Sequence, residues 1–173
     1  VGRTWLTDLD RMTPDVDGEG SPFDLARART RTFGANGTTF AESSPGYEVK
    51  DPKWIRQTLH EAPPCEGILA IYNRGDRQRW MWPCPHCREW FEAEPGLGLF
   101  HLPSDDELLE SIRELDVDRF ARQYARIPCP HCGAIIKPAQ KERMNQAGIW
   151  LEEGLVLDDL GRISGNPRTS SIA

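Results

Sequence analysis

The sequence predicts an α/β unit with parallel strands in the first 64 residues, followed by a small α+β module built around two cysteine pairs. Three observations support this prediction. Short strand-like and helix-like stretches alternate up to Pro64, which is the pattern of parallel strands joined by helices. After Pro64 the chain becomes rich in aromatic residues. Two Pro-Cys-Pro-His-Cys stretches, at 83–87 and 128–132, then enclose a helix-like insertion.

The elements of the first unit follow in order. Residues 3–6 are apolar and β-prone and lead into acidic residues, which predicts a buried strand with carboxylates at its carboxyl end. A helix is predicted at 21–33, with Ser21 as its N-cap. Residues 38–48 predict a second short strand that runs into a Ser-Ser-Pro turn. Residues 51–62 predict another short helix, which ends before Pro63.

The second half has a different pattern. Aromatic and β-branched residues within 67–103 predict short antiparallel strands around the first cysteine pair. A helix is predicted at 104–126, where Ser104 and Glu107 form a capping box. Residues 127–154 predict a strand, a short helix and a return strand around the second pair. The segment 157–173 is polar and rich in turn residues, and we expect a linker there.

Size and composition limit the classes of protein to which the chain can belong. It has 173 residues and a formal net charge of −6 at pH 7. No run of about 18 apolar residues occurs, and the first residues lack the basic and apolar regions of a signal peptide. We therefore expect a cytosolic protein and, because it does not begin with Met, a fragment of a longer one. The acidic net charge does not indicate an overall basic surface for DNA or RNA, so any nucleic-acid contact has to be local.

The four paired cysteines predict a structural metal site. Disulfides are disfavoured in the cytosol, and four thiolates are the ligands of a tetrahedral zinc. The segment 88–128 exceeds the about 15–20 residues of the simplest zinc pattern, and we attribute the excess to the inserted helix. The module is therefore predicted to be zinc-ribbon-like. A thioredoxin-like redox pair and a rubredoxin-like iron site are the alternatives. The predicted ligands are Cys84, Cys87, Cys129 and Cys132.

The remaining cysteine and the histidines inside the pairs are not predicted to be ligands. Four sulfurs leave no vacancy for His86 or His131, which we expect beside the ligands or at the surface. With no open position for water, the metal should be structural and not catalytic. Cys65 has no neighbouring pattern that would lower its thiol pKa, and we expect a small, partly buried residue.

Two other groups of residues are candidates for function. Asp8 and Asp10 follow the first strand, where carboxylates can hold Mg²⁺ and orient a water, although from these residues alone we favour a plain acidic loop after a strand. A basic patch interleaved with tryptophans suggests a nucleic-acid contact. Strand alternation also places Trp80 and Trp82 on one face, and we favour a core position over the metal for both. The arginines of this patch are Arg74, Arg77 and Arg79.

Several blocks of the chain together resemble the large terminase subunit of tailed phages and prophages. The blocks are DLDRMTPDVDGEGSPFDLARARTRTF, ESSP, YNRGDRQRWMWPCPHC, IPCPHCG and ERMNQAGIW, in that order. The resemblance implies that residues 1–64 are the C-terminal part of a P-loop ATPase domain. It also implies that 65–156 form a four-cysteine zinc module with a helical insertion at 104–126. Residues 157–173 would be a linker towards a nuclease domain.

The resemblance also assigns roles to individual residues. The family has a Walker B pattern like Asp-Glu-Val-Asp where this chain has Thr7-Asp8-Leu9-Asp10, so that Thr7 stands at the metal-binding position and Asp8 at the catalytic one. That departure puts efficient hydrolysis in doubt. Ser43 and Ser44, followed by Pro45, are similar to the Ser-Thr-Pro coupling motif. No G-x-x-x-x-G-K-[ST] occurs, and we expect the fragment alone to be inactive.

The cofactors and partners that the resemblance implies belong to the intact protein. They are ATP with Mg²⁺, double-stranded viral DNA, the small terminase subunit and the portal, in an oligomeric motor that packages and cuts DNA. The expected location is the bacterial cytoplasm, transiently at the procapsid portal. The alternative is a free-standing zinc-ribbon module that binds nucleic acid or a protein partner.

Overall fold

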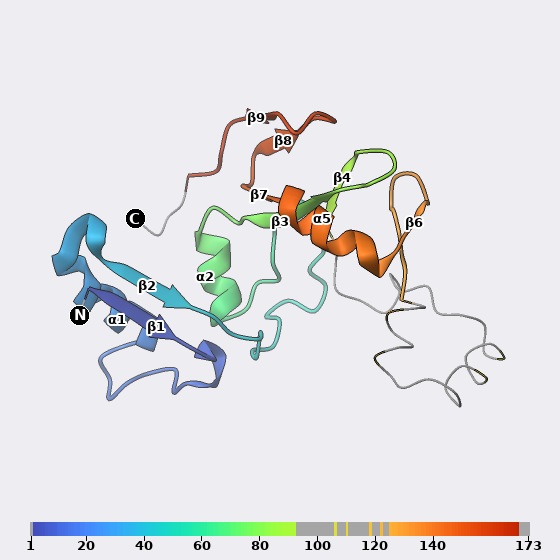
Figure 1. Cartoon of the computed structure of the whole chain (residues 1–173). Helices are drawn as coiled ribbons and strands as arrows, with labels where there is room; N and C mark the ends of the chain where they lie inside the picture. Colours follow the sequence, from blue (N-terminus) through green and yellow to red (C-terminus); the bar gives the residue numbers. More distant parts are fainter. Residues whose placement is uncertain are drawn as a thin grey trace. The chain divides into compact units, whose positions relative to one another are not determined.

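The computed structural model describes residues 2–92 and 125–169, together with the isolated positions 106, 110, 118 and 122. The chain divides into two compact units, Val1–Arg77 with Thr169–Ala173, and Gln78–Arg168 (Figure 1). The predicted helix at 104–126 lies almost entirely outside the described residues. Among the described helices, none is long and apolar enough to cross a membrane.

The first unit contains the predicted parallel strand pair. Strand β1 (Arg3–Leu6) pairs with β2 (Thr38–Ala41) in parallel, with Arg3 opposite Thr38. Helix α1 (Pro22–Thr30) connects them and packs against both strands, and the 3₁₀ helices η1 (Leu9–Arg11) and η2 (Arg31–Asn36) follow β1 and α1. The Ser21 hydroxyl accepts a hydrogen bond from the Asp24 amide at 3.2 Å, which confirms the predicted N-cap.

Strand β1 is not the buried strand that its sequence predicted. The side chain of Trp5 is 70% exposed, and it packs against Phe40, which is opposite it on β2, with 4.5 Å between ring centroids. The reason is the alternation of the strands. Thr39, next to Phe40, bonds the Thr30 hydroxyl of α1 at 2.9 Å, so the helix covers the other face of the pair.

The predicted helix at 51–62 is wrong, and a helix forms further along instead. The segment 51–62 consists of turns, bends and irregular backbone. At its start Asp51 accepts a bond from the Lys53 amide, which competes with helical hydrogen bonding. Helix α2 (Ile68–Arg74) takes up an apolar run in which strands were expected. Short apolar runs have no period that separates a strand from a helix, and here glycines at 67 and 75 bound a single helical segment.

The second unit is built from short antiparallel strands, as predicted. One sheet has the order β4-β3-β7, with β3 at Arg79–Pro83, β4 at Trp90–Glu92 and β7 at Ile149–Leu151. Strands β5 (Ile127–Pro128) and β6 (Ile135–Ile136) form a second pair. The 3₁₀ helix η4 (Pro138–Gln140) and helix α5 (Lys141–Ala147) lead into β7. A hairpin of β8 (Leu155–Leu157) and β9 (Ile163–Gly165) occupies part of the segment predicted to be a linker.

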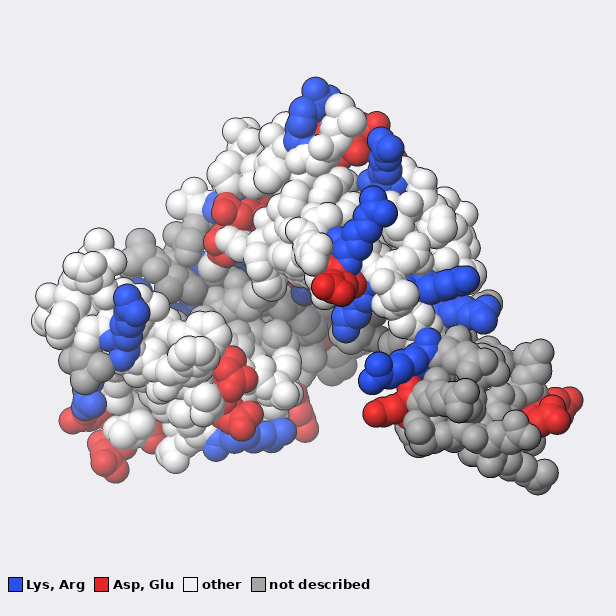
Figure 2. Space-filling model, viewed as in Figure 1, with Lys and Arg blue, Asp and Glu red and all other residues white. Residues whose placement is uncertain are grey.

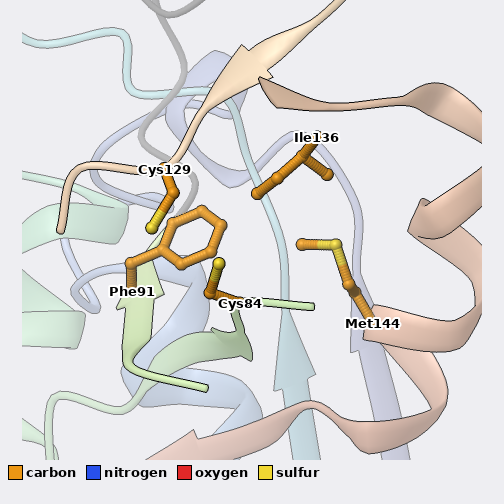
Figure 3. Close-up of a cluster of buried hydrophobic side chains, with 5 residues drawn as sticks. All are labelled: Cys84, Phe91, Cys129, Ile136 and Met144. Atoms are coloured by element: carbon orange, nitrogen blue, oxygen red, sulfur yellow. The ribbon is translucent and has the colours of Figure 1, made fainter. Parts of the chain in front are cut away.

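The core of the second unit forms around the cysteine pairs. Its buried members come from several elements, and the sulfurs of Cys84 and Cys129 lie close to the Phe91 ring (Figure 3). Trp82 is partly buried, packs against this cluster as predicted, and donates its indole N–H to Asn145 at 2.8 Å. Trp80, for which the same position was predicted, is not part of the cluster, and its ring centroid lies 5.2 Å from that of Trp150. The buried members are Cys84, Phe91, Cys129, Ile136 and Met144.

Candidate functional site

Two chain turns with the same backbone geometry present the four cysteines. In the first turn the Cys84 amide donates to the Glu89 carbonyl at 2.9 Å, and the Arg88 amide donates to the Cys84 carbonyl at 3.0 Å. The second turn repeats both bonds, from Cys129 to Ala134 and from Gly133 to Cys129, each at 2.9 Å. Arg88 and Gly133 occupy equivalent positions with φ of 68° and 70°. The second turn therefore has a left-handed glycine, and the first turn adopts the same conformation with an arginine.

The four sulfur atoms fit a tetrahedral metal site. They all lie within 4.8 Å of one another. The sulfurs of Cys84 and Cys132 are 3.9 Å apart, and so are those of Cys87 and Cys129. Zn–S bonds of about 2.3 Å give a tetrahedron with edges of about 3.8 Å. Cys84 and Cys129 are 2% exposed, whereas Cys132 is exposed. The four cysteines can therefore hold a metal ion, and their geometry is consistent with zinc.

The thiols of the cluster differ in their affinity for protons. Desolvation acts to raise the pKa of Cys84, but the backbone N–H groups of Cys87 and His86 outweigh it and lower the pKa to about 7. Desolvation and the neighbouring thiols raise the pKa of Cys87 to about 12, and the same causes raise the pKa of Cys129. The Cys84 thiol therefore has a lower pKa than the thiols of Cys87 and Cys129. A metal that binds all four as thiolates releases protons, so its affinity falls as the pH falls.

The two histidines of the turns do not contribute to the cluster. Both side chains are exposed, and the group of candidate ligand atoms consists of the four cysteines. The His131 ring hydrogen-bonds the Trp90 carbonyl through Nε2 at 3.0 Å, which links the second turn to strand β4. The histidines thus lie beside the ligands, as the sequence predicted.

We expect His86→Ala to leave the metal content of the chain unchanged, because the His86 ring lies at the surface and the ligand set is complete without it. Cys87→Ser, one residue away, should remove the metal. Metal analysis of the two purified variants after dialysis checks both expectations. A loss of metal in the His86 variant would show that the imidazole is a ligand.

The carboxyl ends of β1 and β2 form the second candidate site. Asp8 follows β1 with an exposed side chain and a φ of 52°, and its amide lies 3.3 Å from the Glu42 carboxylate, directly after β2. Ser43 and Ser44 come next. Parallel strands bring these residues to one edge of the sheet. Sequence reasoning missed Glu42, and its position immediately after the second strand was the available indication.

Asp10 differs from Asp8, because its carboxylate is buried and hydrogen-bonded by the backbone. One oxygen accepts from the Gly46 amide at 2.9 Å and the other from the Ile68 amide at 2.7 Å. Its own amide donates to the Ser43 hydroxyl at 3.0 Å. A Cβ at Gly67 would lie 2.2 Å from the Asp10 carboxylate, so only glycine fits there. Asp10 thus joins the Ser43–Gly46 loop to the start of α2.

The three arginines of the predicted basic patch each have a different environment. Arg79 pairs with Glu92 at 2.9 Å, with little exposure of either side chain. Arg77 lies 3.9 Å from Glu61 and donates to the Asn73 carbonyl at 3.1 Å. Arg74 lines a cavity of about 400 Å³ between α1 and α2. The visible face of the molecule carries both signs of charge interspersed (Figure 2).

Cys65 is buried, with 6% exposure, and lies outside the metal cluster. Desolvation raises the pKa of its thiol, and the negative charge of Asp10 adds to this effect. A raised pKa disfavours the reactive thiolate. Cys65 is therefore more buried than the partly buried residue that we predicted, and as predicted it is not part of the ligand set.

Comparison with known proteins gives one family. Residues 2–150 match the family model described as Phage terminase large subunit gpA, ATPase domain. No curated protein and no solved structure matches the chain. The matched range includes the parallel strand pair, both cysteine pairs and helix α5. The chain therefore belongs to the family of phage terminase large subunits, through the gpA ATPase domain.

Proposed function

We propose that the chain is part of a terminase large subunit that packages and cuts viral DNA at the expense of ATP. Membership of the family supports a role in phage DNA packaging. The observation that carries the proposal is the parallel pair β1–β2, which brings Asp8 and the Ser43–Ser44 segment to one edge. Carboxyl ends of parallel strands are where α/β proteins bind their ligands.

The residues at this edge of the sheet would have different roles. Asp8 is exposed and would stand at the position of the catalytic carboxylate, with Thr7 where the family has its metal-binding Asp. Asp10 would position the loop, since its carboxylate and amide bond Gly46, Ile68 and Ser43. ATP with Mg²⁺ supplies the phosphoryl chemistry in the intact protein. The coupling motif would respond through the bond that joins Ser43 to Asp10.

The cysteine module would have a structural role. Four thiolates complete the tetrahedron of a zinc ion and leave no position for a water molecule. The sulfurs are part of the core of the second unit, so that metal binding and folding of this unit are coupled. We propose that the module provides a rigid connection or a docking surface between the motor and the nuclease of the intact protein.

The chain by itself should turn over no ATP and cut no DNA, because its 173 residues contain no G-x-x-x-x-G-K-[ST] to hold the phosphates. A phosphate-release assay and a plasmid-cleavage assay with the purified chain check this expectation. Asp8→Asn is the matched control. ATP turnover that the wild type shows and this variant lacks would contradict the proposed inactivity and would assign the reaction to the fragment itself.

The alternative is a free-standing zinc-ribbon module that binds nucleic acid or a protein partner. With DNA as its partner, it predicts binding that weakens steeply with salt and that requires a folded second unit. Electrophoretic shift titrations with duplex DNA at two salt concentrations test it, with Cys129→Ser as the comparison. Salt-dependent binding that disappears in this variant would favour the alternative, and binding that persists would exclude the cysteine module as the DNA contact.

A further inference from the structure

The four cysteines of the metal cluster differ in their access to solvent. Cys84 and Cys129 are each 2% exposed, and their sulfurs lie in the core beside the Phe91 ring (Figure 3). Cys87 is half-buried, whereas Cys132 is exposed and lies within an exposed run at residues 130–133. A small reagent in solution therefore has the most direct access to Cys132.

Backbone N–H groups hydrogen-bond the other three sulfurs of the cluster. The His86 amide donates to the Cys84 sulfur at 3.4 Å. Backbone N–H groups also donate to the sulfurs of Cys87 and Cys129, where they act against desolvation to lower the thiol pKa. No backbone N–H of a described residue donates to the Cys132 sulfur. Because a hydrogen bond to a thiolate makes it a poorer nucleophile, Cys132 is also the least protected of the four.

A second thiol lies within reach of Cys132. The sulfurs of Cys132 and Cys84 are 3.9 Å apart, although the two residues belong to different turns and are 48 positions apart in the sequence. A disulfide needs a separation of about 2.05 Å, so a small displacement of the two turns closes the gap. A bond between these sulfurs would remove two of the four ligands. The two cysteines that remain cannot complete a tetrahedral site.

We propose that Cys132 is an oxidation site, at which hydrogen peroxide starts the formation of a disulfide with Cys84. The Cys132 thiolate attacks one peroxide oxygen, so that an S–O bond forms, the O–O bond breaks and hydroxide leaves. The Cys84 thiolate then attacks the sulfur of this sulfenic acid, so that an S–S bond forms and a second hydroxide leaves. Each hydroxide takes up a proton. Two thiolates, one peroxide and two protons thus give one disulfide and two waters, and the peroxide gains the two electrons that the sulfurs lose.

The reaction would make the fold of the second unit sensitive to oxidants. Cys84 is a member of the buried cluster, so its transfer from the ligand set to a disulfide disturbs the core and releases the metal. A thiol reductant reverses the reaction, and transient disulfides of this kind act as redox sensors in the cytosol. The release of the metal rests on the proposed structural role of the cysteine module. The formation of the disulfide does not, because it needs only the two thiolates and the peroxide.

The full wild-type chain tests the site directly. The chain is loaded with zinc and treated with hydrogen peroxide, its remaining thiols are alkylated, and its peptides are mapped by mass spectrometry while a dye records free zinc. We expect a disulfide between Cys84 and Cys132, release of zinc, and recovery of both thiols with dithiothreitol. Cys65 is the internal control, because it is 6% exposed and lies outside the cluster, and it should stay reduced.

The outcomes separate this proposal from the proposed metal site. A chain that holds zinc and keeps its thiols under peroxide overturns the oxidation site alone. A disulfide between any other two cysteines, or oxidation of Cys65 before Cys132, overturns it as well. A chain that never holds zinc contradicts the metal site, and its disulfide map still decides whether Cys132 reacts with Cys84.

Two histidine substitutions give a matched pair of variants. Cys132→His and Cys87→His each leave three cysteines and one imidazole, a ligand set that structural zinc sites also use. The rate of zinc release by peroxide should fall about tenfold in Cys132→His, which lacks the exposed thiol, and stay at the wild-type rate in Cys87→His. Circular dichroism and zinc content before treatment establish that each variant is folded, and the disulfide map of the wild type decides where one is not. Equal rates of release in two folded variants contradict the role of Cys132.

Discussion

Replacing Cys129 by Ser is expected to unfold the second unit while the first unit stays folded. Cys129 is 2% exposed, contacts the Cys87 sulfur at 3.9 Å and belongs to the buried cluster that forms the core. Structural zinc contributes about 10–16 kcal/mol to the folding of zinc-finger peptides at pH 7. Whole domains have a free energy of unfolding of about 5–15 kcal/mol. The loss of most of the zinc contribution is therefore as large as the stability of a domain, or larger. The near-ultraviolet circular dichroism of the tryptophans in this unit should therefore collapse.

The matched control for this experiment is Cys65→Ser. Cys65 is also buried, but it lies in the first unit and outside the metal cluster. Its replacement removes a buried thiol without removing a ligand, so that the second unit should keep its metal and its near-ultraviolet spectrum. If Cys129→Ser retained the spectrum and cooperative melting of the wild type, a metal-dependent fold would be excluded.

Asp10→Ala should destabilise the first unit by about 2–5 kcal/mol. The substitution leaves two amides without their charged acceptor, those of Gly46 and Ile68, and each such loss costs about 1–3 kcal/mol. These bonds connect segments 36 and 58 positions away in the sequence, so their loss should loosen the whole unit. Urea unfolding measures the change in free energy. Faster hydrogen exchange at the Gly46 and Ile68 amides would locate it.

Asp8→Asn is the control for Asp10. Asp8 is exposed, has a left-handed backbone that Asn tolerates, and its carboxylate accepts no hydrogen bond from the described residues. Its replacement should change stability by less than about 0.5 kcal/mol. Equal stability of the Asp8 and Asp10 variants would contradict the positioning role of Asp10. Both carboxylates would then be equal candidates for catalysis.

Features governed by nearby residues were predictable from the sequence. The Ser21 cap depends on an amide three positions away, and the parallel pair follows from the order of strand, helix and strand. The cysteine cluster was also predictable, because two short pairs of thiols have few arrangements that let all four sulfurs meet a metal. Family membership is confirmed over residues 2–150.

Features that depend on distant residues were not predictable. The bonds of Asp10 join three segments that are far apart in the sequence, so the motif alone could not separate it from Asp8. Helix α2 forms where an apolar run fits a strand equally well. The exposure of Trp5 depends on which face α1 covers, and the sequence of the strand does not contain that information.

The zinc content of the purified chain is the most direct test of the metal site. After exhaustive dialysis at neutral pH, elemental analysis should find one zinc per chain, because four sulfurs within 4.8 Å of one another form a complete tetrahedral ligand set. The Cys129→Ser chain, treated in the same way, should contain almost none. Much less than one zinc per wild-type chain, or one iron in its place, would contradict the structural zinc on which our account of the second unit depends.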